Sequence, residues 1–243
     1  MSTKRGCLRA MKWAAILVIC SFLLATLVAV LLGFSTTLPG EKKTPAGLPR
    51  NAAQYLTMRD GVRIAIDVWH PSDLAAEQRV PTVMRSTRYW RAIELGFSFR
   101  VLVGCGLVPP ETDADIESLN TRGYAVVLVD ARGSGASFGQ RPVEWSDEEV
   151  ADLGEVAEWI AKQPWSNGNV GTFGVSYDGN TAELAAASGS TAIKAVAPLY
   201  SDFDPVGYLA LPGGVFNNGF ISEWNDSNQF LDKNDLLSAI KLT

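Results

Sequence analysis

The chain has 243 residues, of which 47% are apolar and 19% are charged, which suffices for one globular domain of substantial size. Four of its 21 basic residues stand within the first forty positions, and all 26 acidic residues come after them, so the remainder is acidic. An acidic surface excludes nucleic acid from the expected partners. One histidine and three cysteines indicate neither a metal-ligand cluster nor a disulfide framework, and we expect no cofactor and no bound metal.

A long apolar segment lies near the N-terminus. Residues 13–34 carry no charge and have the length of about 20 residues that a membrane-crossing helix requires. The basic leader 1–12 has no acidic residue, which predicts a cytoplasmic N-terminus and an extracytoplasmic remainder. We favour a retained single-pass anchor, because the apolar core of a cleaved signal is shorter, roughly 7 to 15 residues. Cleavage and secretion are the alternative. A flexible linker is expected over 35–53.

Residues 54–204 alternate predicted strands with predicted helices. A hairpin is expected over 55–71, turned by Asp60-Gly61, and its alternating second arm predicts one buried face. A capping box begins the second of the predicted helices at Ser146. Strands at this pitch, separated by helices, predict an α/β fold with a mainly parallel sheet and helices on both faces. Further strands are expected at 81–86, 124–130, 169–175 and 193–198, and helices at 113–121, 147–162 and 177–188.

Ser176 stands between a predicted strand and a predicted helix, in the sequence Gly-Val-Ser-Tyr-Asp-Gly at 174–179. A serine at such a sharp turn projects its hydroxyl above the sheet, and flanking glycines let neighbouring elements approach closely. The usual motif has its second glycine two residues after the serine, whereas here that position is Asp178 and the glycine is Gly179. We predict that Ser176 is the nucleophile of a serine hydrolase; a serine that only caps the helix is the alternative.

The added tyrosine makes this motif resemble that of the cocaine esterase and X-Pro dipeptidyl-peptidase family of α/β-hydrolases. Four longer segments resemble the family in the same order and spacing: MRDGVRIAIDVWHP, PTVMRSTRYWR, RGYAVVLVDARGSGASFG and EVAEWIAKQPWSNGNVGTFGVSYDG. The resemblance runs from about residue 55 to about residue 201. It implies an α/β-hydrolase fold and an esterase, acylase or X-Pro dipeptidyl-peptidase that acts on a small-molecule ester, amide or peptide through an acyl-enzyme.

The resemblance also implies an oxyanion hole. In the family, a tyrosine hydroxyl after the third strand and the backbone N–H of the residue after the nucleophile hold the oxyanion. Tyr89 matches the first donor, and Tyr177 supplies the second. Two donors aimed at the developing negative charge would stabilise the transition state. An aromatic side chain that only packs at a strand end is the alternative for Tyr89.

A general base and its partner carboxylate are not evident in the sequence. A serine nucleophile normally needs a histidine, and the only one, His70, precedes the serine, whereas this fold has the order serine, acid, histidine. We expect His70 not to be the base. Asp202 and Asp204 follow a predicted strand and are candidates for the acid.

In the resembled family the acid and the histidine lie further along the chain, beyond a helical insertion that covers the active site. Residues 205–243 are expected to begin that insertion, so the sequence is expected to stop within the cap and to be inactive by itself. The rival hypothesis is a non-catalytic protein, either a truncated product or a membrane-anchored α/β scaffold without the triad histidine.

Overall fold

The computed structural model describes residues 51–71, 74–91 and 114–234. The predicted membrane segment at 13–34 lies outside these ranges. Among the residues that are described, none of the helices combines the length and the apolar character needed to cross a bilayer.

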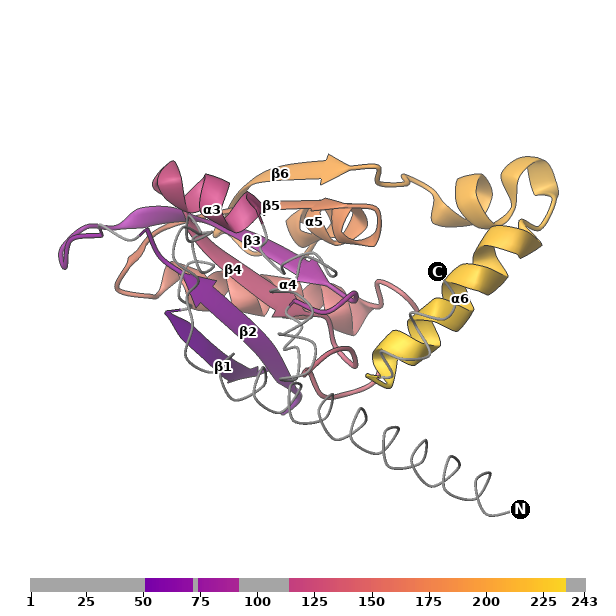
Figure 1. Cartoon of the computed structure of the whole chain (residues 1–243), viewed down its shortest axis with the longest axis horizontal. Coiled ribbons are helices and arrows are strands. Elements are labelled where there is room, and N and C mark those ends of the chain that lie inside the picture. Colours follow the sequence, from indigo (N-terminus) through magenta and orange to yellow (C-terminus); the bar gives the residue numbers. More distant parts are fainter. Residues whose placement is uncertain (1–50, 72–73, 92–113, 235–243) are drawn as a thin grey trace, which may run out of the picture. The chain divides into compact units, whose positions relative to one another are not determined.

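Six strands form one mixed sheet in the order β1-β2-β4-β3-β5-β6 (Figure 1). β2 pairs antiparallel with β1 and with β4, whereas β4, β3, β5 and β6 are parallel neighbours. The predicted strands are confirmed, and the four parallel strands end at one edge, which we call the carboxyl edge of the sheet. The strands are β1 (Ala52–Thr57), β2 (Arg63–Trp69), β3 (Val80–Thr87), β4 (Ala125–Asp130), β5 (Ser166–Val175) and β6 (Ile193–Leu199).

Helices pack on both faces of the sheet, as the sequence predicts. Alternate side chains of β4 point to opposite faces, so Val126 and Leu128 pack with Ile116 of α3, whereas Val127 and Val129 belong to the core formed with α4 and α5. The helices are α3 (Ala114–Thr121), α4 (Asp147–Ala161), α5 (Tyr177–Ala187), a π-helical turn η1 (Pro205–Ala210), a 3-10 turn η2 (Pro212–Gly214) and α6 (Asn218–Asp232).

Strand β2 is buried on both faces, so the expectation of one buried face was wrong. Ile64 and Ile66 point into the core beneath α4 and α5, and Trp69 packs in the cluster beneath α3. Asp67 is fully buried, and its carboxylate is paired with Arg91 at 3.2 Å. Asp67, which the alternating pattern placed on an exposed face, is therefore buried, because Arg91 on another segment neutralises its charge.

The capping box at the start of α4 is confirmed, except that one of its two hydrogen bonds is made one residue earlier than in the standard motif. The Ser146 hydroxyl accepts a hydrogen bond from the Glu149 N–H at 3.4 Å, as expected. The Glu149 carboxylate accepts from the N–H of Trp145, at 3.1 Å, where a standard box uses the N–H of the cap residue. Glu149 is thereby fixed at the beginning of α4 with its second oxygen directed elsewhere.

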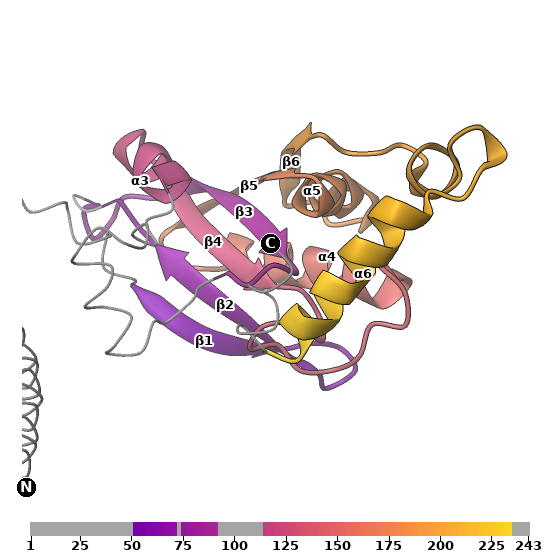
Figure 2. The same cartoon turned by 45° about the vertical axis from the view of Figure 1, so that its right-hand side comes forward.

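The segment after β6 exposes large apolar side chains. Phe203 is 92% exposed, Tyr200 88% and Tyr208 72%, and β6 itself is mostly exposed. The helical turns η1 and η2 lead into α6, which lies beyond the carboxyl edge of the sheet in both views (Figures 1 and 2). That residues 205–243 begin a cap insertion stays a prediction.

Candidate active site

Ser176 occupies a strained turn between β5 and α5. Its backbone has φ 60° and ψ −123°, a region that costs a residue other than glycine about 1–3 kcal/mol. Two hydrogen bonds hold the turn: the Ser176 N–H donates to the Leu199 carbonyl at 3.0 Å, and its carbonyl accepts from the Asn180 N–H at 3.0 Å. Ser176 is exposed, as a nucleophile open to substrate must be.

The two flanking glycines are required by close backbone approaches. A Cβ on Gly174 would lie 2.2 Å from the carbonyl oxygen of Asp178, and one on Gly179 would lie 2.4 Å from that of Leu199. Gly179 therefore lets α5 approach β6 at the turn. This contact gives the physical reason for a glycine three residues after the serine, where the usual motif has it after two.

Tyr89 lies beside Ser176 at the carboxyl edge. It follows β3, which pairs with β5, so the two side chains come from neighbouring strand ends. Burial raises the pKa of the Tyr89 hydroxyl, and hydrogen bonds with Trp224 and with Ser176 act in the opposite direction. The phenol is therefore protonated at neutral pH and lies close to the serine.

Tyr177 is fixed by its ring, which is 2% exposed and stacks on Trp145 at 4.9 Å. Its hydroxyl donates to Glu149 Oε1 at 2.5 Å. Burial raises the pKa of both groups. Because Tyr177 is the first residue of α5, its backbone N–H is one of the helix-start donors without an intrahelical acceptor, next to Ser176. The anchored ring thus holds an available N–H donor in place.

A buried arginine supports this arrangement and was missed by sequence reasoning. Arg88 is 2% exposed, and it is ion-paired with Glu144 and, at 2.9 Å, with Asp232 of α6. Its guanidinium lies over the rings of Tyr177 and Trp224, at 5.6 Å and 5.3 Å from their centres. The only sequence signal was its position directly before Tyr89.

His70 lies at the opposite edge of the sheet from Ser176. Because β2 runs antiparallel to β4, the end of β2 lies where the parallel strands begin. There the His70 ring packs 4.8 Å from Trp165, the residue before β5, while Ser176 follows the other end of that strand. The 10 residues of β5 span about 30 Å. The expectation that His70 is not the base agrees with this placement.

Asp202 and Asp204 follow β6 and have local structural partners. The Asp204 carboxylate accepts a hydrogen bond from the Gly207 N–H at 2.9 Å and so caps η1. The backbone of Asp202 is held by the Asn180 side chain, which donates to its carbonyl at 3.0 Å. Neither contact is the carboxylate-to-histidine bond that a catalytic acid makes.

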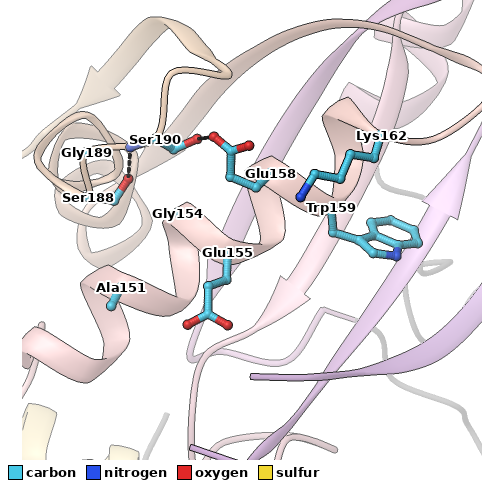
Figure 3. A pocket seen from close by; sticks show the side chains of 9 residues that line it. All are labelled: Ala151, Gly154, Glu155, Glu158, Trp159, Lys162, Ser188, Gly189 and Ser190. Carbon is cyan, nitrogen blue, oxygen red and sulfur yellow. Dashed lines mark hydrogen bonds between the residues drawn. The ribbon is translucent and has the colours of Figure 1, made fainter. Parts of the chain in front are cut away.

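A groove of about 540 Å³ lies between α4 and residues 188–190, which follow α5 (Figure 3). It runs along α4 between Ala151 and Lys162 and is closed by residues 188–190. The Ser190 hydroxyl donates to Glu158 Oε1 there at 2.7 Å. Since α5 has 11 residues, the groove is about 16 Å along the helix from the serine, and the groove and the candidate active site are separate.

A family model described as X-Pro dipeptidyl-peptidase (S15 family) matches residues 60–237. The chain belongs to this family. The resemblance inferred from the sequence motifs is thereby confirmed, and the family match extends past residue 201, where that resemblance ended, to residue 237.

Two proteins of similar sequence are named as esterases. A presumed serine esterase from Mycobacterium bovis is 43% identical over 194 residues, which cover 79% of this chain and 31% of the relative. Cocaine esterase from a Rhodococcus strain is 37% identical over 171 residues, covering 69% of this chain and 26% of that protein. The matched part of the chain therefore spans between a quarter and a third of the length of these relatives, which are named as ester hydrolases.

A solved structure gives the same result for the fold. A CocE/NonD family hydrolase from Staphylococcus aureus superposes with a TM-score of 0.63 at 31% sequence identity, covering 76% of this chain and 33% of that one. The mixed sheet with helices on both faces is therefore the arrangement of an α/β-hydrolase-like protein.

Proposed function

We propose that this chain carries the nucleophile and the oxyanion donors of a serine hydrolase that cleaves a small-molecule ester, amide or peptide. The observation that carries the proposal is the strained, exposed Ser176 at the carboxyl edge, with Tyr89 beside it. A positive φ at a serine is retained when the surrounding contacts impose it, and such strain clusters at active sites. A serine that served only as a helix cap would bond an N–H of α5 through its side chain, and Ser176 makes no such bond.

The proposed chemistry has two steps. The Ser176 oxygen attacks the substrate carbonyl carbon, and the resulting oxyanion is held by the Tyr89 hydroxyl and the Tyr177 N–H. A general base removes the proton of the Ser176 hydroxyl during the attack and passes it to the alcohol or amine, which leaves as the intermediate collapses. The acyl group stays on Ser176 until water hydrolyses it. The preserved donors alone would stabilise the negative charge, since a hydrolase without its triad retains part of its rate enhancement.

The chain offers no histidine placed to act as the general base in this proposal. His70 is the only histidine of the chain, and it lies at the other edge of the sheet. We therefore expect the 243-residue chain by itself to form no acyl-enzyme at a catalytic rate. Added imidazole in solution would supply a base that reaches the exposed Ser176.

Reaction with a fluorophosphonate tests this directly. Without imidazole we expect no stoichiometric phosphonylation, and with imidazole we expect slow phosphonylation that Ser176→Ala abolishes. Rapid labelling of Ser176 without imidazole would contradict the absence of a base. No labelling under either condition would favour the non-catalytic scaffold.

We further propose that residues 13–34 anchor the protein in the membrane with the hydrolase part outside the cytoplasm. The support is the uncharged segment of 22 residues behind a basic leader. Membrane fractionation and N-terminal sequencing of the mature protein test it. A mature N-terminus beyond residue 34 would replace the anchor by a cleaved signal.

A further inference from the structure

The Tyr89 hydroxyl has a second partner, contributed by α6. The indole N–H of Trp224 donates a hydrogen bond to the Tyr89 oxygen at 3.1 Å. The two residues are 135 positions apart in the sequence. The bond is partly buried, so water does not readily replace it.

The chemistry of the two groups gives this bond a direction. An indole N–H can only donate, whereas a phenol can both donate its single proton and accept. With Trp224 donating to the phenol oxygen, the Tyr89 proton cannot be directed at Trp224 and is available to another acceptor. Ser176 lies close enough to the Tyr89 hydroxyl to affect its pKa, so the space above the serine is where this proton can be directed.

We propose that Trp224 is a positioning residue that orients the Tyr89 hydroxyl proton toward the oxyanion site above Ser176. This rests on the proposed role of Tyr89 as an oxyanion donor. A hydrogen bond received by the phenol oxygen also polarises its O–H group, so the same contact strengthens Tyr89 as a donor.

The end of α6 is fastened by the residues on either side of Tyr89. Arg88 is ion-paired with Asp232, the last residue of α6, at 2.9 Å. The indole N–H of Trp90 donates to the carbonyl of Leu231 at 2.9 Å. Arg88 also places its guanidinium over the Trp224 ring, at 5.3 Å.

The segment 88–90 and α6 therefore make four contacts, of which only one involves the Tyr89 hydroxyl. This separates two roles that α6 could have. Loss of the Trp90 bond would loosen the helix end, whereas loss of the Trp224 bond would release the phenol. The two tryptophans are thus a matched pair for an experiment.

The test uses the 243-residue chain with 3-fluorotyrosine at position 89. We expect Trp224→Phe to shift the 19F resonance, because the phenol loses its donor, and Trp90→Phe to leave it nearly unchanged. Imidazole-assisted phosphonylation of Ser176, measured in the unlabelled chain, should slow about threefold to tenfold in Trp224→Phe, the effect of one hydrogen bond. In a Tyr89→Phe background, Trp224→Phe should have no further effect.

Three outcomes would overturn the inference. An unchanged 19F resonance in Trp224→Phe would show that the bond does not act on the phenol. Equal slowing by Trp224→Phe with and without the Tyr89 hydroxyl would show that Trp224 acts on the fold alone. If Tyr89→Phe itself leaves phosphonylation unchanged, the proposed function of Tyr89 fails, and that result is distinct from the other two.

A second variant covers the case in which Trp224→Phe does not fold. Replacement of Trp224 by benzothienylalanine keeps the shape of the indole and exchanges only the N–H for sulfur. We expect this variant to show the same 19F shift and the same slowing of phosphonylation as Trp224→Phe. An unchanged resonance or an unchanged rate would overturn the inference.

Discussion

At the scale of single residues, the site depends on backbone contacts that leave no room for a side chain. Gly179 allows the first turn of α5 to lie against the end of β6, and the Leu199 carbonyl accepts the Ser176 N–H at the same place. The turn geometry of the nucleophile and the packing of α5 therefore share one point of contact. A change there should affect stability and reactivity together.

Gly179→Ala should destabilise the fold by about 1–3 kcal/mol or more, since its Cβ would lie 2.4 Å from the Leu199 carbonyl oxygen. Gly219→Ala is the matched control, because nothing lies within 4 Å of that position in α6 and alanine favours a helix. Urea unfolding measures both. Equal effects of the two substitutions would contradict the close contact at Gly179.

The hydrogen bond from the Tyr177 hydroxyl to Glu149 is a second contact between single residues that should stabilise the site. Tyr177→Phe would leave Oε1 of the buried Glu149 carboxylate without a donor, while Oε2 keeps the bond from the Trp145 N–H, and we expect a loss of about 1–3 kcal/mol in unfolding free energy. Tyr55 is 46% exposed, so Tyr55→Phe should change the unfolding free energy by no more than about 0.5 kcal/mol. Similar values for both variants would mean that the bond to Glu149 contributes little.

At the scale of elements, local signals and long-range contacts differ in how well the sequence predicts them. The strands, the helices α3, α4 and α5 and the Ser176 turn were predicted because apolar periodicity, capping residues and glycines act over a few positions. The contacts of Tyr89 with Trp224 and of Tyr177 with Glu149 were not, since they join residues 135 and 28 positions apart. The buried charge Asp67 was missed because its partner lies on another segment.

The turn of the β1–β2 hairpin is joined to the turn after β4 by an ion pair. The hydrogen bond from Arg132 lowers the pKa of Asp60 from 3.8 to about 2. A depressed pKa means that the pair stabilises the fold above pH 3.8 and that this contribution is lost as pH falls through about 2.

Asp60→Asn should therefore lower stability at neutral pH, and its difference from the wild type should shrink as pH falls from 4 toward 2. Chemical unfolding at a series of pH values measures this difference. The other carboxyl groups are the same in both proteins, so their effect on the unfolding free energy drops out of the difference. A difference that stays constant over that range would show that Asp60 ionisation is not linked to folding.

At the scale of the whole molecule, the described part of the chain exposes apolar surface on and after β6. The side chains of Phe203 and Tyr208, 92% and 72% exposed, belong to this surface. Exposed apolar patches and an unpaired strand edge favour association. We expect the 243-residue chain to self-associate as its concentration rises.

Sedimentation velocity tests that expectation. Phe203→Glu combined with Tyr208→Glu should shift the protein toward the monomer, because two charges would interrupt the patch. The same change at Tyr55 and Phe138, which contact each other at 5.5 Å near the other end of the sheet, should leave the association unchanged. A double variant that associates as strongly as the wild type would place the contact elsewhere.

The proposed nucleophile and its oxyanion donor are tested most directly by mapping where a fluorophosphonate reacts in the presence of imidazole. Peptide mass mapping should find the phosphonyl group on Ser176, and Tyr89→Phe should reduce its rate of attachment about tenfold or more. Attachment to other serines at the same rate as to Ser176 would contradict the role of Ser176 as the nucleophile. A rate that Tyr89→Phe does not change would contradict the role of Tyr89 as an oxyanion donor.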